Sequence, residues 1–243
     1  YCKSLYASIQ KFTKQTMKKL NTHSQEYFIE LIKEKYRLED RMGRDVISID
    51  PESSKDYDDA FGLSETDDTY IVSIYITNVS MWLDVLNVWT SFTERVSTIY
   101  LPDRRRPMLP TILSDILCSL KQDDCKFAFT LDLIIDKETE QLVDYKFSNT
   151  IIQIRKNYVY DTEEQGTDTM YVKTRDLLCR LNKKKEYKYI DSIETSHDVI
   201  AYLMIWMNYT SAQEFVKNKC GLFRSSKMNE TFNPLWKLFS KEN

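Results

Sequence analysis

The most informative stretch of this sequence reads Asp50-Pro-Glu-Ser-Ser-Lys-Asp56-Tyr-Asp58-Asp59-Ala60. It places four aspartates within ten residues, directly after the apolar, β-branched run at 46–49, so a buried strand is expected to end where the charges begin. Carboxylates this close repel one another once water is removed, and Lys55 is the single basic residue among them. Because oxygen ligands suit hard divalent cations, the stretch predicts a Mg²⁺ site that works with phosphate chemistry.

Two other interpretations of the acidic stretch are possible. A calcium loop of the EF-hand type needs glycine at its sixth position and glutamate at its twelfth, where this chain has Lys55 and Phe61, so that class is excluded. A solvent-exposed acidic turn is the other interpretation. The apolar segments on both sides indicate that the stretch is buried. Because buried carboxylates without a counter-charge are costly, a metal site is favoured over a solvent-exposed turn.

Composition limits the class of protein. The chain has 243 residues, 42% of them hydrophobic and 29% charged, which fits one large globular domain or two small ones. Its net charge of −3 provides no overall basic field, so binding of nucleic acid would depend on local patches. Only four glycines occur, and neither a Walker motif nor a dinucleotide fingerprint is present.

The cysteines form no recognisable framework. Their number, five, is odd, no CxxC pair occurs, and the chain has only two histidines, so neither a disulfide scaffold nor a zinc site is predicted. This usage is typical of a reducing, intracellular compartment, with cytoplasm or nucleus undecided. No apolar run approaches the ~18 residues of a membrane span, so no membrane partner is expected. Because the chain starts with Tyr1, we expect a processed or partial sequence.

Hydrophobic periodicity predicts an α+β fold in which helices pack on a mixed or antiparallel sheet. Residues 1–38 have a helical pattern with a break at 21–24, where Ser24 is the expected N-cap; their lysines form either a solvated face or an RNA-backbone contact. His23 is expected to be exposed and to have no functional role. His197 is expected to have a structural role in the first turn of a long helix. The pattern predicts strands at 46–49, 60–63, 70–79, 82–85, 127–135, 142–147 and 150–154, and helices at 89–97, 113–120, 172–181 and Ser196–Lys217, the last with Ser196 as N-cap.

A proline-rich loop at 101–110 carries three consecutive arginines, Arg104, Arg105 and Arg106. Guanidinium groups on a rigid loop match phosphate oxygens and would form an RNA clamp. A solvated loop is the alternative, and the residues alone do not decide between the two.

From residue 46 to about 136 the sequence resembles the catalytic RNB domain of the ribonuclease II and R type exoribonucleases, which include the catalytic subunit of the eukaryotic exosome. The family opens with Ile-Asp-Pro followed by Lys-Asp-aromatic-Asp-Asp-Ala, which Ile49-Asp50-Pro51 and Lys55-Asp56-Tyr57-Asp58-Asp59-Ala60 match. Later matches, in the family's order, are Tyr100-Leu-Pro-Asp103, Pro107-Met-Leu-Pro110 and Leu117-Cys-Ser-Leu120.

The resemblance implies a Mg²⁺-dependent hydrolase that degrades single-stranded RNA processively from 3′ to 5′ and releases nucleoside 5′-monophosphates. It implies that the four aspartates, Asp50, Asp56, Asp58 and Asp59, hold one or two Mg²⁺ ions and position the attacking water. Tyr100 would stack on the terminal base, and Tyr160 would lie at the RNA channel. We expect a helical lead-in at 1–45 and an RNB-like catalytic domain at 46–243, truncated or reduced.

The sequence departs from the family in ways that keep an alternative open. Asn78 replaces an aspartate, the arginine-bearing Ser-Pro-Ile-Arg-Arg-Tyr segment is absent, and so are the accessory OB-fold domains. Such domains or protein partners would lie outside these residues. The alternative is a catalytically inactive RNB-like protein that serves as an RNA-binding or assembly scaffold. An unrelated metal-dependent phosphatase would leave the Tyr-Leu-Pro and Pro-Met-Leu-Pro matches unexplained.

Overall fold

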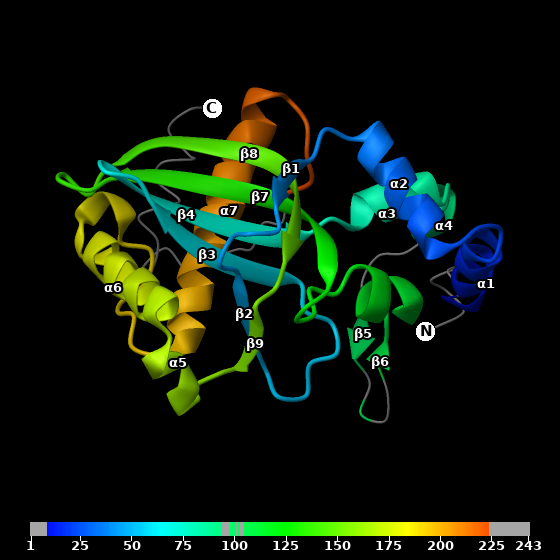
Figure 1. Cartoon of the computed structure of the whole chain (residues 1–243), viewed down its shortest axis with the longest axis horizontal. Coiled ribbons are helices and arrows are strands. Elements are labelled where there is room, and N and C mark those ends of the chain that lie inside the picture. Colours follow the sequence, from blue (N-terminus) through cyan, green and yellow to red (C-terminus); the bar gives the residue numbers. More distant parts are fainter. Residues whose placement is uncertain (1–8, 94–97, 101, 103–104, 224–243) are drawn as a thin grey trace. The chain divides into compact units, whose positions relative to one another are not determined.

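The computed structural model describes residues 9–93, 98–100, 102 and 105–223 of the chain (Figure 1). Two compact units divide inside helix α7 (Ser196–Lys217), one ending at Met204 and the other beginning at Ile205. The strands and the acidic stretch all lie in the first unit. Over the described residues, no helix combines the length and the apolar character needed to cross a membrane.

A mixed, seven-stranded sheet forms the centre of the first unit, with the spatial order β1-β8-β7-β4-β3-β2-β9 (Figure 1). The pairs β1–β8 and β2–β9 are parallel and the other neighbours are antiparallel. This arrangement confirms the predicted α+β class. The strands are β1 (Glu39–Arg41), β2 (Ile47–Asp50), β3 (Asp59–Glu65), β4 (Thr69–Thr77), β7 (Cys125–Asp136), β8 (Leu142–Gln153) and β9 (Lys156–Val159). The segments 142–147 and 150–154, predicted as separate strands, belong mostly to one strand, β8.

Strand β1 lies inside the segment assigned to the helical lead-in, so the sheet begins earlier in the chain than residue 46. The guanidinium of Arg41 holds it there by donating to both carboxylate oxygens of buried Asp132, at 2.7 and 2.6 Å. Ser73 donates to the same carboxylate at 2.6 Å. A buried charge needs such partners. The proposed domain division between residues 45 and 46 stays a prediction.

Helices α1 (Ile9–Leu20) and α2 (Gln25–Lys35) share a hydrophobic core with α3 (Val79–Val85) and η1, a π-helix at Ile112–Leu117. Ser24 caps α2 as predicted, accepting from the Tyr27 N–H at 3.3 Å. The predicted strand at 82–85 is wrong. These residues form the second half of α3, because Trp82 and Leu83 are buried among the helices, and a short apolar run does not distinguish strand from helix.

The remaining elements are α4 (Trp89–Thr93), β5 (Ile99–Tyr100), β6 (Arg105–Arg106), α5 (Glu163–Thr167), α6 (Thr169–Lys183) and the 3₁₀ turn η2 (Lys185–Tyr187). Helix α6 contacts β3 and confirms the helix predicted at 172–181 (Figure 1). Helix α7 has the predicted bounds, but Ser196 is not its cap. Thr195 and Asp198 form a reciprocal cap instead: Thr195 Oγ1 accepts from the Asp198 N–H at 3.3 Å, and the Asp198 carboxylate accepts from the Thr195 N–H at 2.8 Å.

Candidate active site

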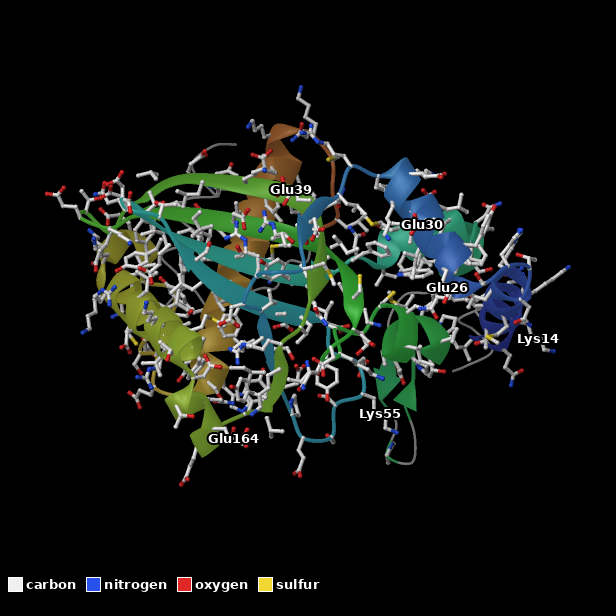
Figure 2. The ribbon with its side chains drawn as sticks, in the orientation of Figure 1. Lys14, Glu26, Glu30, Glu39, Lys55 and Glu164 are labelled. Atoms are coloured by element: carbon white, nitrogen blue, oxygen red, sulfur yellow. The ribbon has the colours of Figure 1, made fainter. Side chains whose placement is uncertain are left out.

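The acidic stretch forms the connection between the neighbouring strands β2 and β3 (Figure 1). Asp50 is the last residue of β2 and Asp59 the first of β3, while Asp56 and Asp58 lie on the loop between them. Because the two strands are antiparallel, the end of one and the start of the other lie at the same edge of the sheet. Figure 2 shows Lys55 on this loop.

The loop is fastened to residues 118–120, which follow the π-helix η1. The Tyr57 N–H donates to Ser119 Oγ at 3.0 Å, and the Tyr57 carbonyl accepts from the Leu120 N–H at 2.9 Å. Next to them, the Asp58 carbonyl accepts from the Thr77 N–H at 2.9 Å. Ser119 is fully buried. The Leu-Cys-Ser-Leu motif therefore holds the acidic loop in position, a role that its sequence did not indicate.

Burial and mutual repulsion govern the electrostatics of the loop. Burial, together with the negative charges of Asp59, Asp58 and Asp56, raises the pKa of Asp50 to about 7. Burial and the charge of Asp58 raise the pKa of Asp59 to about 6. In addition, Asp50 Oδ2 is buried and has no hydrogen-bond partner among the described residues. A cation or a hydrogen-bond donor at this oxygen would stabilise the charged form of Asp50.

A hard divalent cation fits this donor set by its chemistry, since all the side chains are carboxylates and one buried oxygen is unpartnered. The described residues do not, however, bring three His, Cys, Asp or Glu side chains together closely enough to hold one ion. The structure thus places the predicted aspartates at one edge of the sheet, but their side chains do not converge on one metal position. A bound ion would need their side chains to turn toward one point, or oxygen ligands from water or substrate.

Tyr160 lies directly beside this cluster. Strand β9 runs parallel to β2, and the Tyr160 N–H donates to the Asp50 carbonyl oxygen at 3.1 Å. Burial, followed by the charges of Asp59, Asp50 and Asp161, raises the pKa of the Tyr160 phenol to about 12. Its hydroxyl is therefore protonated at neutral pH and available as a hydrogen-bond donor at the edge of the aspartate cluster.

His197, expected to have a structural role in the first turn of the long helix, packs against Tyr160. Its ring stacks on Tyr160 with the centroids 3.7 Å apart and the planes 9° from parallel. Its Nε2 lies 3.8 Å from a carboxylate oxygen of Asp161. The other oxygen of that carboxylate accepts from the Ser196 N–H at 3.1 Å and the Ser196 hydroxyl at 2.8 Å. No local signal marks this grouping, because it depends on the start of α7 meeting the end of β9.

The predicted RNA contacts at 100–106 are only partly described. Strands β5 and β6 pair antiparallel, with Tyr100 opposite Arg105 and Ile99 opposite Arg106. The side chains of Tyr100, Arg105 and Arg106 and the whole of Arg104 lie outside the described residues, so their roles stay predictions.

Asn78, at the position where the resemblance implies an aspartate, is a buried amide with its own partners. Its Nδ2 donates to Asn149 Oδ1 at 3.0 Å, and its Oδ1 accepts from the Ser80 hydroxyl at 2.5 Å. The residue is satisfied as a neutral amide and contributes no charge to the loop.

Comparison with known proteins reveals several similarities. A family model described as "RNB domain" matches residues 38–170. Ribonuclease R of Ureaplasma parvum is 34% identical over 144 residues, which are 58% of this chain and 19% of that protein. The chain therefore spans about a fifth of the length of this curated relative.

Two solved structures share the fold at low sequence identity. Mycoplasma genitalium RNase R in complex with double-stranded RNA gives a TM-score of 0.64 at 21% identity, over 79% of this chain and 40% of that one. Yeast Ssd1, described as a pseudonuclease, gives 0.59 at 13% identity, over 80% of this chain and 27% of that one.

Proposed function

This chain belongs to the RNB domain family, and from that premise we propose that the protein is a hydrolytic exoribonuclease. It acts on single-stranded RNA from the 3′ end and releases nucleoside 5′-monophosphates. The similarity to ribonuclease R of Ureaplasma parvum supports this reaction class.

The observation that carries the proposal is the burial of two neighbouring carboxylates, Asp50 and Asp59, at one edge of the sheet. Asp50 and Asp59 lie at one sheet edge with raised pKa values, and a buried oxygen of Asp50 has no partner among the described residues. A group of like charges that destabilises the fold is expected to be balanced by a ligand when the protein works. The carboxylates Asp50, Asp56, Asp58 and Asp59 would hold one or two Mg²⁺ ions, which when bound supply a polarised water and neutralise charge on the phosphate.

Other residues of the chain position these groups and the RNA end. Ser119 fixes the loop backbone at Tyr57, which limits where the adjacent Asp56 and Asp58 side chains reach. Tyr160, protonated at neutral pH because its pKa is raised to about 12, donates a hydrogen bond to an oxygen of the RNA next to Asp50. Its ring cannot rotate freely, because His197 covers one face. Tyr100 supplies a stacking surface for the terminal base.

A second candidate is a catalytically inactive, RNA-binding scaffold with the same fold. Two observations favour it: the described carboxylates do not converge into a three-ligand set, and yeast Ssd1, described as a pseudonuclease, shares the fold. The aspartate cluster weighs against it, since binding alone does not require four neighbouring like charges.

Degradation of a uniformly labelled single-stranded RNA tests the two candidates. The proposal expects Mg²⁺-dependent release of monophosphates by the wild-type protein, its loss in EDTA, and its loss in Asp58→Asn, which removes one charge at nearly constant volume. Asp67→Asn, in the exposed β3–β4 turn, is the matched control and should retain activity. If the protein binds this RNA but releases no monophosphate with Mg²⁺ present, the scaffold is favoured; undiminished release by Asp58→Asn would exclude the proposed metal role.

A further inference from the structure

Helix α1 presents a lysine-rich face to the solvent. Its twelve residues contain four exposed lysines, Lys11, Lys14, Lys18 and Lys19, and no aspartate or glutamate. The opposite face buries Phe12 and Thr16. The lysines therefore cannot turn inward, and they make a local positive surface on a chain whose net charge is −3.

Three of the four lysines on α1 lack the ion pairs that the lysines of α2 form within the described part of the chain. On α2, Lys33 pairs with Glu30 at 2.8 Å and Lys35 with Asp84 at 2.5 Å. Lys14, Lys18 and Lys19 form no ion pair with any residue in the described part of the chain. Figure 2 places Lys14 on α1 and the carboxylates of Glu26 and Glu30 on the adjoining α2, so the basic surface ends where α2 begins.

An exposed pair of stacked rings follows the last turn of α1. His23 and Tyr27 stack with their centroids 4.1 Å apart and their planes 17° from parallel, and Tyr27 is 43% exposed. Hydrogen bonds link this pair to the end of α1: Thr22 Oγ1 donates to the Lys19 carbonyl at 2.6 Å, and His23 Nδ1 lies 2.9 Å from the same hydroxyl. An aromatic platform is therefore fixed next to Lys18 and Lys19.

We propose that α1 and the turn to α2 form a second contact surface for single-stranded RNA, apart from the aspartate cluster. Lys14, Lys18 and Lys19 contact successive phosphates, and a base stacks on the Tyr27–His23 pair. Cationic side chains together with stacking rings are the two components by which proteins bind single strands without sequence preference. The inference takes RNA as the ligand from the proposed function, but it does not depend on catalysis.

Binding of a fluorescein-labelled oligouridylate in EDTA, followed by anisotropy over a range of KCl concentrations, tests this surface. The triple variant Lys14→Ala, Lys18→Ala, Lys19→Ala should weaken binding about tenfold and reduce the salt slope by about 2, because each lost phosphate contact on a single strand reduces it by about 0.7. Tyr27→Leu should weaken binding about tenfold with the salt slope unchanged, because stacking releases no counterions.

The matched control is Lys183→Ala, Lys185→Ala, Lys188→Ala, which removes the same charge from exposed lysines elsewhere. Equal weakening by both triple variants would reduce the effect to net charge and overturn the proposal. An unchanged affinity of the α1 variant for oligouridylate would also overturn the proposal. If the α1 lysines are needed for binding of polyglutamate but not of oligouridylate, the surface binds an acidic protein partner and the proposal is wrong. Circular dichroism and Tm establish that each variant is folded. Binding is measured in EDTA and therefore does not depend on catalysis. If the wild-type protein shows no RNase activity with Mg²⁺, the proposed function is contradicted, but the binding result still tests this surface.

Discussion

The main-chain N–H of Tyr160 donates a hydrogen bond to the carbonyl oxygen of Asp50, with 3.1 Å between nitrogen and oxygen. The two residues are far apart in the sequence and meet because β9 lies parallel to β2, with Asp50 in register with Val159. The contact fixes the distance between the aspartate cluster and the stacked rings of Tyr160 and His197.

The stability of the metal-free protein should fall as pH rises through the acidic to neutral range. The pKa of Asp50 is raised from 3.8 to about 7 in the folded chain, so the folded state holds this proton more tightly than the unfolded state does. The free energy of unfolding therefore decreases between about pH 4 and pH 7. Asp50→Asn, which is neutral at all pH values, should be more stable than the wild type by about 2 kcal/mol at pH 8 and similar to it at pH 4.

Urea denaturation in EDTA at both pH values measures this difference. Adding Mg²⁺ at pH 8 should then raise the Tm of the wild type and leave that of Asp50→Asn nearly unchanged. Equal pH dependence in both proteins would show that desolvation of Asp50 does not destabilise the fold.

Ser119→Ala should loosen the acidic loop. The hydroxyl of Ser119 accepts from the Tyr57 N–H at 3.0 Å and donates to the Lys55 carbonyl at 3.4 Å. Removing it leaves a part-buried N–H without a partner, which costs about 1–3 kcal/mol. The expected result is lower stability in urea and faster hydrogen exchange at the Tyr57 amide. Ser192→Ala removes a hydroxyl from an exposed residue and should change stability by less than about 0.5 kcal/mol; a similar loss in both variants would contradict the role of Ser119.

His197→Ala should reduce RNase activity about tenfold, and His197→Phe should retain most of it, because stacking on Tyr160 is the contact that matters. The chain has two histidines, so the Hε1 resonance of His197 can be identified by NMR. Its ring-current shift should disappear in Tyr160→Leu. If the phenylalanine variant loses as much activity as the alanine variant, the approach of Nε2 to Asp161 would be the important contact instead.

Gly62→Ala should destabilise the strand that carries Asp59. A Cβ at Gly62 would overlap the main-chain carbonyl oxygen of Asp45, and a backbone atom cannot move aside as a flexible side chain can. We expect a loss of about 2–3 kcal/mol, measured by thermal unfolding. Gly166→Ala is the control, since a Cβ there has nothing within 4 Å and Gly166 lies in α5. It should be neutral or stabilise by up to about 1 kcal/mol, and equal losses in both would rule out the proposed overlap.

The sequence by itself determined the class of fold and the place of the acidic loop between two strands. Alternating and continuous apolar runs marked β3, β4 and β7, and the Asp50–Asp59 spacing marked a strand that ends in a carboxylate loop. These features are local: they depend on the period of the backbone and on charges close together in the chain. The RNB resemblance rested on the same motifs, and the match at residues 38–170 confirms it.

Only the tertiary structure decided which distant residues join that loop. The parallel pairing of β2 with β9 places Tyr160 at Asp50, the start of α7 places His197 on Tyr160, and the segment after η1 places Ser119 under Tyr57. Tertiary packing also explains why the strand predicted at 82–85 is wrong. These residues are helical because their apolar side chains pack into the core formed by the neighbouring helices. Register between distant strands and burial against distant helices are set by the packing of the whole unit, so no short stretch of sequence encodes them.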